Sequence, residues 1–533
     1  MLSGFLCVVL LFFLPLAWGC RHQAVGPDWD KAFYTDLTSA SLDRAQLELV
    51  AQEALDDAPI LSAWLRITLP YNQTMFPRNV ASPLFTWDND DSDSWLVCVL
   101  PESGAPVVVR VGETRWVPGA ETWEGIKAAS LDTPARIVIL GLNSQGLAHS
   151  VGEIEIVISA EQVAWPIMWQ EMPLPFTFGR EHPESFTWRL GDVASYDEPR
   201  TVLTDQEVCG MCHSFSLNGE AFGLDLDVDG DKGAFLLSRV EDGLNLTRDN
   251  LFSWTDFQND GQVTLGLFAR ISPDAGYVAA TIREKSMLVT FDDPMYSEFF
   301  FPLRGVLAFF RSDLSRFGYL PGADDPGYVH AGPGWSPDGK YLAFSRAPVI
   351  EEYLPVMDGR GSFPAAPGED IHDLNARYPM RFDIYRIPFN DGAGGEAEPM
   401  PGASDNGRSN YWPRYSPNGQ WLVYTQADNA MMNQPNSDLH IIPAQGGESR
   451  RLACSRDSHN SWHSWSPDSG WMVFVSKTLG PHTRLFLAKM HPDGTSSPPV
   501  FLHRFATEDM ASVLPEFAPQ GLVNMDGISL DME

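Results

Sequence analysis

Hydrophobic and polar residues follow two different periods along this 533-residue chain, first that of a helix and then that of strands. From Ser39 to Ala58 apolar residues recur at helical spacing opposite acidic and amide residues, which predicts one amphipathic helix. From Ala63 onward, short alternating runs separated by Pro, Gly and Asp predict a small antiparallel sandwich of immunoglobulin-like type. Its predicted strands are 65–69, 94–100, 107–111, 135–140 and 153–158.

A tight turn followed by an alternating strand recurs through the rest of the chain. The clearest copy is Trp335-Ser336-Pro337-Asp338-Gly339, which leads into Tyr341–Ser345. Each copy predicts a hairpin inside a small sheet, because Pro-Asp/Asn-Gly favours a tight turn. With the Ser or Ala of each copy as its marker, the six markers stand at 216, 272, 336, 416, 466 and 518, separated by 56, 64, 80, 50 and 52 residues. Six copies predict the six blades of a β-propeller.

The segment before the first marker is Cys209-Gly210-Met211-Cys212-His213. Cys-x-x-Cys-His is the attachment sequence of c-type haem. Two thiols at this spacing can reach the two vinyl groups of one porphyrin, and the adjacent imidazole then lies under the iron. A redox dithiol is the alternative, but 216–228 predicts a strand where a thioredoxin-like site needs a helix.

The repeats resemble those of TolB-like propellers over about residues 210–525. The last copy has room for two strands only, so an earlier segment such as 185–190 is expected to pair into the final blade and remove its free edge. Together with the haem motif, the pattern is similar to a bacterial family of exported TolB-like proteins that carry one c-type haem. That resemblance implies the fold, covalent haem c and an exported location, but no reaction.

The predicted fold class is therefore mainly β, with a sandwich followed by a six-bladed TolB-like propeller. Its predicted parts are a signal peptide at 1–20, a helical segment at 21–60, the β-sandwich at 61–180 and the propeller at 181–533.

Aligning the repeats places further residues beside the haem motif. Cys212 and His213 stand four and three positions before their marker. Because equivalent positions on innermost strands converge at one mouth of a propeller channel, the haem is expected there, against tryptophans. The residues at the same two positions in the fourth and fifth copies are Trp412, Pro413, Trp462 and His463.

The far side of the predicted haem must be covered by another part of the chain. A conventional cytochrome c domain needs on the order of 80 to 100 residues, whereas strands are predicted three residues after His213. Loops of the propeller mouth or the sandwich would then supply the sixth iron ligand. His463 is the first candidate and His330 the second; a hydrogen-bonding role for His463, or a Met ligand, is the alternative.

The net charge and the N-terminal residues indicate where the protein is located and which classes of partner it can bind. With 70 Asp and Glu against 36 Lys and Arg, the net charge of −34 excludes nucleic acid or anionic lipid as the main partner. The apolar run 5–18 predicts an export signal. Ala17-Trp18-Gly19-Cys20 resembles a lipoprotein box, so Cys20 is the predicted lipidation site of a periplasmic or outer-membrane lipoprotein held only by its lipid. Plain secretion and an uncleaved anchor are the alternatives.

Other candidate sites carry less specific signals. The acidic loops 88–93 and 225–231 could each hold Ca²⁺, although a solvated turn and a polar blade tip are the simpler interpretations. Cys98 lies in a predicted buried strand. The sequence leaves open whether Cys98 and Cys454 form a disulfide. A Gly-x-Ser-x-Gly elbow is absent from the sequence, which counts against peptidases that carry such a propeller.

Two functions follow from these observations. The first is an exported monohaem c-type cytochrome that transfers electrons, or senses redox state or a small ligand, with a redox or envelope protein as partner. The second is a TolB-like module that holds a partner peptide at its channel mouth, with haem structural or absent. Catalytic residues are not assigned, and whether the protein is an enzyme stays open.

Overall fold

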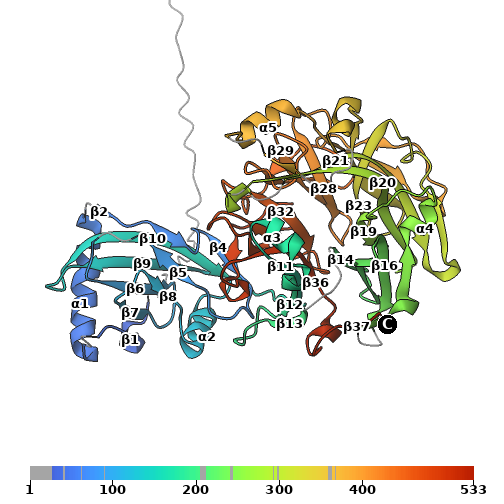
Figure 1. The fold of residues 1–533 in the computed structure, drawn as a ribbon. Coiled ribbons are helices and arrows are strands. Elements are labelled where there is room, and N and C mark those ends of the chain that lie inside the picture. Colours follow the sequence, from blue (N-terminus) through green and yellow to red (C-terminus); the bar gives the residue numbers. More distant parts are fainter. Residues whose placement is uncertain are drawn as a thin grey trace, which may run out of the picture.

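The computed structural model is mainly β, with an N-terminal unit beside a ring of sheets (Figure 1). It describes residues 27–39, 42–61, 63–88, 91–204, 212–240, 244–291, 293–296, 299–357, 363–365 and 368–532. The predicted signal peptide with Cys20, and Cys209 of the haem motif, lie outside these residues. Within these ranges, every helix is too short or too polar to traverse a bilayer.

Six antiparallel blades make up the ring in the described part of the chain, and a parallel bridge between Gly305 and Val329 joins the second and third into one sheet. The innermost strand of each sheet contacts that of the next, and the sixth contacts the first, so the strands enclose a central channel. This arrangement is that of a β-propeller, as the repeats predict. The innermost strands are β14 (His213–Phe215), β19 (Leu267–Ile271), β23 (Tyr328–Trp335), β28 (Ser409–Tyr415), β32 (Asn460–Trp465) and β36 (Met510–Phe517).

Each of the first five sheets continues outward in sequence order. The strands that follow the innermost one are β15 (Ala221–Val228), β16 (Asp231–Arg239) and β18 (Leu251–Ser253); β20 (Tyr277–Thr290), β21 (Phe299–Arg311) and β22 (Arg316–Tyr319); β24 (Tyr341–Pro348), β26 (Asp383–Pro388) and β27 (Glu398–Pro399); β29 (Trp421–Ala427), β30 (Asp438–Pro443) and β31 (Arg450–Arg451); and β33 (Trp471–Ser476), β34 (Arg484–Lys489) and β35 (Val500–Phe501).

The repeated turn is held by the side chain of its marker serine. In the third copy the Ser336 hydroxyl donates to Asp338 Oδ1 at 2.7 Å and accepts from the Tyr341 amide at 2.9 Å. The copies at Ser216, Ser272, Ser416 and Ser466 make the same pair of bonds. The sequence repeat is therefore a local hydrogen-bonded motif that starts the second strand of each blade.

The ring is closed by pairing the C-terminal strand with strands that precede the first repeat. β36 pairs with β11 (Ile167–Pro173), which pairs with β12 (Thr187–Gly191) and then β13 (Arg200–Leu203). The predicted closing segment, 185–190, thus lies in the final sheet as β12, one strand removed from β36. This pairing covers the outward edge of β36, which would otherwise be free.

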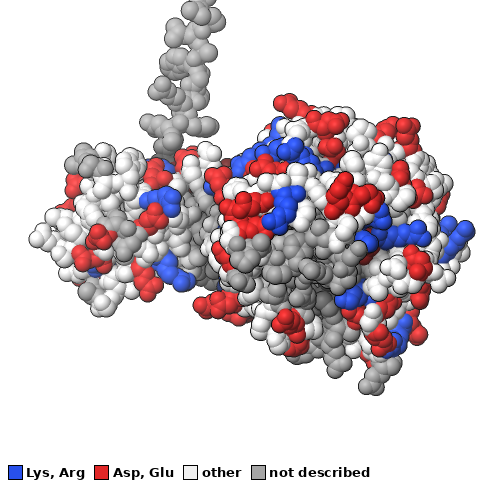
Figure 2. All heavy atoms as spheres, turned by 45° about the horizontal axis from the view of Figure 1, so that its top comes forward, with Lys and Arg blue, Asp and Glu red and all other residues white. Residues whose placement is uncertain are grey.

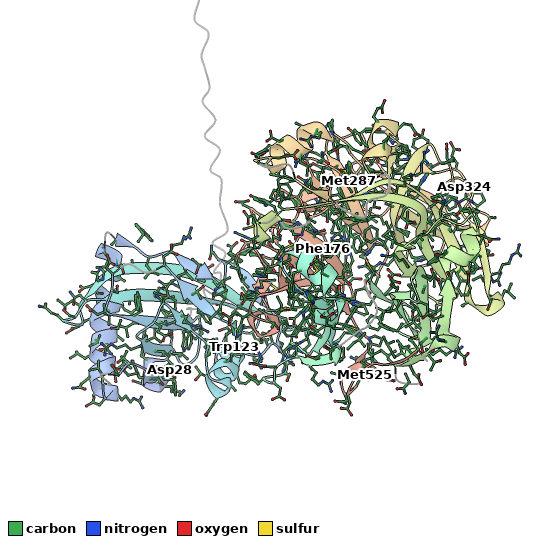
Figure 3. The ribbon with its side chains drawn as sticks, in the orientation of Figure 1. Asp28, Trp123, Phe176, Met287, Asp324 and Met525 are labelled. Atoms are coloured by element: carbon green, nitrogen blue, oxygen red, sulfur yellow. The ribbon has the colours of Figure 1, made fainter. Side chains whose placement is uncertain are left out.

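A long hairpin of the second blade crosses one face of the ring. β20 and β21 extend beyond their sheet, and Lys477 beside the opposite blade donates to the backbone carbonyl of Met295 at 2.8 Å. We call residues 284–291, 293–296 and 299–304 the arm. Met287 of the arm is fully buried, and its labelled position shows where the arm passes over the ring (Figure 3). The arm therefore covers the face where the innermost strands begin.

The N-terminal unit is a mixed sheet covered by helices, so the predicted immunoglobulin-like sandwich is wrong. The order of the main sheet is β1 (Phe33–Asp36), β7 (Val107–Val111), β6 (Ser94–Pro101), β9 (Pro134–Leu142), β10 (Ala148–Ile158) and β2 (Ala63–Trp64), with β4 (Thr74–Phe76) also on β10. β1 runs parallel to β7, and β2 and β4 run parallel to β10. Alternation along the sequence identifies strands but not their direction or partners, which explains the error.

Helices and a small sheet cover the two faces of this main sheet. The predicted amphipathic helix is confirmed as α1 (Arg44–Asp57), which is capped by Asp43 and buries Leu47, Ala51 and Ala54 against one face. α2 (Ala120–Ala129) packs on the other face with a three-stranded sheet of β3 (Ile67–Leu69), β5 (Phe85–Trp87) and β8 (Arg115–Trp116). A helix thus takes the place of the second sheet of a sandwich.

The N-terminal unit and the ring share one hydrophobic cluster. Trp123 of α2 belongs to the same cluster as Trp471 of β33 and Trp169 of β11 (Figure 3). An ion pair of 2.6 Å between Lys489 and Glu161 lies at the same boundary. The two parts are therefore packed together through their cores.

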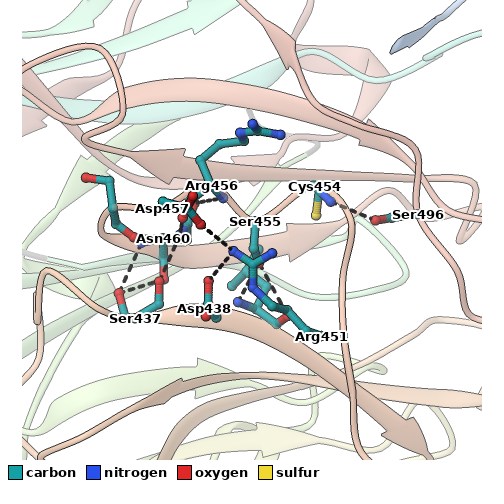
Figure 4. A network of polar contacts seen from close by, with 11 residues as sticks. Ser437, Asp438, Arg451, Cys454, Ser455, Arg456, Asp457, Asn460 and Ser496 are labelled. Carbon is teal, nitrogen blue, oxygen red and sulfur yellow. Dashed lines mark hydrogen bonds and ion pairs between the residues drawn. The ribbon is translucent and has the colours of Figure 1, made fainter. Parts of the chain in front are cut away.

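A polar network joins the fourth and fifth blades (Figure 4). Asn460 is fully buried and donates to the Ser437 carbonyl at 2.8 Å, while Arg451 lies 2.9 Å from Asp438 and 3.4 Å from Asp457. Because buried amides are costly when unpaired, this network fixes the entry of β32.

Candidate functional site at the central channel

Five of the six innermost strands share a backbone distortion at the level of the channel. Four positions before the marker, five described strands have a left-handed residue: Phe268, Gly332, Trp412, Trp462 and Leu514, with φ between 52° and 64°. The strand register breaks at the same place in all five, for example between Tyr411 and Arg414. A non-glycine residue in this region costs roughly 1 kcal/mol or more, so packing must hold it there.

Aromatic side chains from these positions fill the channel. Trp412 and Trp462 meet edge to face with ring centroids 4.6 Å apart, and Phe268 meets Trp412 at 5.2 Å. We call these three residues the aromatic plug. Cys212 lies in the same buried cluster, and Phe300 of the arm contacts Phe268. Cys212, Trp412 and Trp462 thus belong to one large hydrophobic cluster of the ring.

A charged layer follows the plug two positions further along each strand. Arg270 is 9% exposed and forms an ion pair with Glu516, whose other carboxylate oxygen accepts from the Phe215 amide at 3.2 Å. Arg414 lies over the Trp412 ring at 4.1 Å. The layer consists of Ser214, Arg270, Gly334, Arg414, Ser464 and Glu516.

Beyond this layer the channel opens into a cavity of about 160 Å³. All six innermost strands line it, through the charged layer and through aromatic and proline rings near the markers. We call it the channel-end cavity. It lies at the C-terminal ends of the innermost strands.

Tryptophans of neighbouring blades hold the backbone of both arginines. The Trp335 indole donates to the Arg270 carbonyl at 2.9 Å, and the Trp465 indole donates to the Arg414 carbonyl at 3.3 Å. The sequence interpretation missed both arginines and Glu516. A signal was present, because all three stand two positions before a marker in the repeat alignment.

Burial perturbs the titratable groups that lie near the plug and the charged layer. Burial raises the pKa of Cys212, and the nearby Asp225 carboxyl raises it further. Burial also raises the pKa of Asp225 well above its usual range, although Arg270 opposes the shift. The pKa of Arg270 falls to about 10 through burial. At neutral pH the protonated Cys212 thiol therefore lies near charged Arg270, and burial disfavours the charged form of Asp225.

His213 and His463 occupy equivalent places between adjacent blades. His463 donates from Nε2 to the Val423 carbonyl at 3.1 Å, and His213 faces the backbone of Met168, on the corresponding strand of the preceding blade. Neither ring nitrogen of His213 makes a hydrogen bond of good geometry among the described residues, although the Met168 backbone opposes the fall in the pKa of the ring. Burial lowers the pKa of both histidines to about 3, so both imidazoles are neutral at pH 7.

The remaining predicted residues lie elsewhere. His330 is fully buried and donates from Nδ1 to the Gly305 carbonyl at 3.2 Å. In the acidic stretch 225–231, Asp227 faces Lys232 and Asp229 pairs with Arg248. In the described ranges three or more His, Cys, Asp or Glu side chains nowhere gather in a metal-holding arrangement; part of the loop 88–93 is outside them. Cys98 and Cys454 are free and lie in separate clusters.

Comparisons with known proteins find distant structural likeness only. No protein-family model and no curated protein matches the chain. Among solved structures, TolB from Acinetobacter baumannii is similar over 72% of this chain and 79% of its own, with 15% identity and a TM-score of 0.40. A putative TolB from Agrobacterium tumefaciens is similar over 67% and 99%, with 13% identity and a TM-score of 0.35. Hydrazine synthase from Kuenenia stuttgartiensis is similar over 58% and 74%, with 13% identity and a TM-score of 0.30.

Proposed function

We propose that the protein is an exported propeller module of the bacterial cell envelope that binds an extended segment of a partner protein at its channel-end cavity. A lipid on Cys20 would hold it at the membrane. The observation that supports binding is the cavity itself, which all six innermost strands line. Clefts with apolar walls and a few fixed polar groups are typical binding sites.

The polar groups of the cavity suit recognition of a ligand. Both carboxylate oxygens of Glu516 already accept bonds, from Arg270 and from the Phe215 amide. The backbone of each arginine is fixed by an indole of the next blade. Groups held in this way lose little conformational entropy when a ligand binds, which favours affinity.

Site-specific photo-crosslinking tests this proposal. Leu217 lines the cavity and is 38% exposed, whereas Leu314 is 58% exposed outside the cavity lining. We expect a photoreactive residue at 217 in the full-length exported protein to give one defined adduct with an envelope protein, and the same residue at 314 to give none. Ser464→Trp should abolish the adduct by filling the cavity. Equal labelling from 217 and 314, or labelling that persists in the filled variant, would contradict the proposal.

Covalent haem is a second candidate function, which one observation favours. Both ring nitrogens of buried His213 lack a hydrogen bond of good geometry in the described chain, whereas Nε2 of the equivalent His463 bonds to the Val423 carbonyl; the Met168 backbone still acts on the His213 ring. A buried imidazole without a partner is available to a metal, so the donor set fits. Cys209 and Cys212 would form the thioethers, His213 would be the proximal ligand, and His463 stays the candidate sixth ligand. Haem held there would supply one-electron transfer.

Replacing both thiols tests the haem candidate. We expect Cys209→Ala/Cys212→Ala in the full-length exported protein to lose covalent haem staining completely, because both thioether bonds are removed. Cys98→Ala is the matched control, since Cys98 is a buried free thiol in a separate cluster. If the wild-type protein carries no haem stain when it is exported with the attachment machinery, the haem proposal fails and the binding proposal remains.

A further inference from the structure

We propose that Arg414 binds a carboxylate group in the channel-end cavity, so that the ligand of this site is an organic acid group carried by the partner segment. The inference rests on the proposed binding function for the source of the carboxylate, but the carboxylate site itself stands on geometry. Probes that differ only in an acid or an amide group test the carboxylate site independently of the proposed partner-binding function.

The charges around the cavity leave one cation without a counterion. Glu516 neutralises Arg270. Arg414 has no carboxylate within ion-pair distance among the described residues: Nη1 donates to the Pro413 carbonyl at 2.9 Å and more weakly to the Pro333 carbonyl. Its Nη2 atom is buried and has no hydrogen-bond partner there. A buried guanidinium with unused donors is costly, and an anion in the cavity would satisfy it.

The guanidinium is held in one place before any ligand binds. Its plane lies over the Trp412 ring at 4.1 Å, and the carbonyl of the same residue accepts from the Trp465 indole. Burial, and then the charge of Arg270, lower the pKa of Arg414 well below its usual range. An anion beside it would oppose both effects. The site therefore gains from a negative ligand without reorganising.

The geometry favours a carboxylate over phosphate. The layer carries two positive charges and one negative charge, so a single negative charge completes the balance. A dianionic phosphate would leave an excess negative charge next to Glu516, where desolvation makes repulsion expensive. The cavity wall also contains Phe215, Trp335, Tyr415 and Trp465, whose rings suit the organic part of an acid. A guanidinium can bond both oxygens of one carboxylate.

The protein as a whole does not provide a general attraction for anions. The whole chain has a net charge of −34, and basic and acidic side chains are interleaved on the face drawn in Figure 2. Carboxylate binding must then come from the local, buried arginine. This makes the prediction specific to one side chain.

Titration of the full-length protein with matched small probes tests the site. The probes are acetate, the tripeptide N-acetyl-Gly-Gly-Leu with a free C-terminal carboxylate, and its C-terminal amide, all at one ionic strength, followed by saturation-transfer NMR and tryptophan fluorescence. We expect the acid to bind at least tenfold more tightly than the amide. Arg414→Met should remove that difference, whereas Arg450→Met should keep it, because Arg450 also stacks on a tryptophan of the same blade but outside the cavity.

A second variant keeps the test decisive if Arg414→Met does not fold. Glu516→Gln removes the competing negative charge, so it should bind the acid more tightly than wild type does. Equal binding of acid and amide to the wild-type protein, or weaker acid binding by Glu516→Gln, would overturn the proposal. Acetate binding as tight as that of the peptide acid would identify a small-molecule carboxylate as the ligand. That result, without a crosslinked partner at 217, would remove the proposed partner-binding function and leave the carboxylate site.

Discussion

Glu516→Ala should lower the free energy of unfolding by about 3–5 kcal/mol, because it leaves Arg270 buried without its counterion. The two side chains are 11% and 12% exposed, so water cannot replace the lost carboxylate. The loss also frees the Phe215 amide from its acceptor. Urea unfolding followed by tryptophan fluorescence gives the change from the shift of the transition midpoint.

An exposed ion pair provides the control for this measurement. Glu398 lies 3.7 Å from Arg386 and its side chain is 66% exposed, so Glu398→Ala should cost less than about 1 kcal/mol. The double variant Arg270→Met/Glu516→Leu should recover most of the stability, because an apolar pair of similar volume has no buried charge. A loss below about 1 kcal/mol for Glu516→Ala would show that the pair is solvated and does not stabilise the ring.

Ending the chain after Thr507 should prevent the ring from forming. The truncation removes β36, so β11 loses its inner partner and the innermost strands on either side of the gap lose their contact. It also exposes Trp169, which is fully buried and stacks on Phe505 at 4.9 Å. We expect the truncated protein to be degraded by trypsin within minutes at a concentration that leaves the full chain intact.

A shorter truncation separates closure from chain length. Ending the chain after Asp526 removes β37 (Ser529–Asp531), which pairs only with β17 (Asn245–Thr247), and leaves β36 in place. This variant should keep wild-type trypsin resistance in the ring. Equal sensitivity of the two truncations would show that the extreme C-terminus, and not β36, closes the structure.

The sequence by itself determined the local elements and the number of repeats. The hydroxyl of Ser336 bonds within five residues of its own position, so this kind of turn is visible in the printed sequence wherever it recurs. The helix α1 was equally visible, because its apolar stripe and its Asp43 cap are local features. Alignment of the repeats also placed Trp412 and Trp462 at one level of the channel, where their rings meet.

Only the tertiary structure decided partners that lie far apart in the chain. Arg270 and Glu516 belong to different blades, and alternation of polar and apolar residues cannot indicate which of several buried charges will pair. Alternation also does not indicate that β1 runs parallel to β7, or that β11 and not β12 lies beside β36. The register and direction of a strand depend on how much apolar surface each arrangement buries. This buried area is set by how the sheets pack against one another, so it cannot be read from the sequence alone.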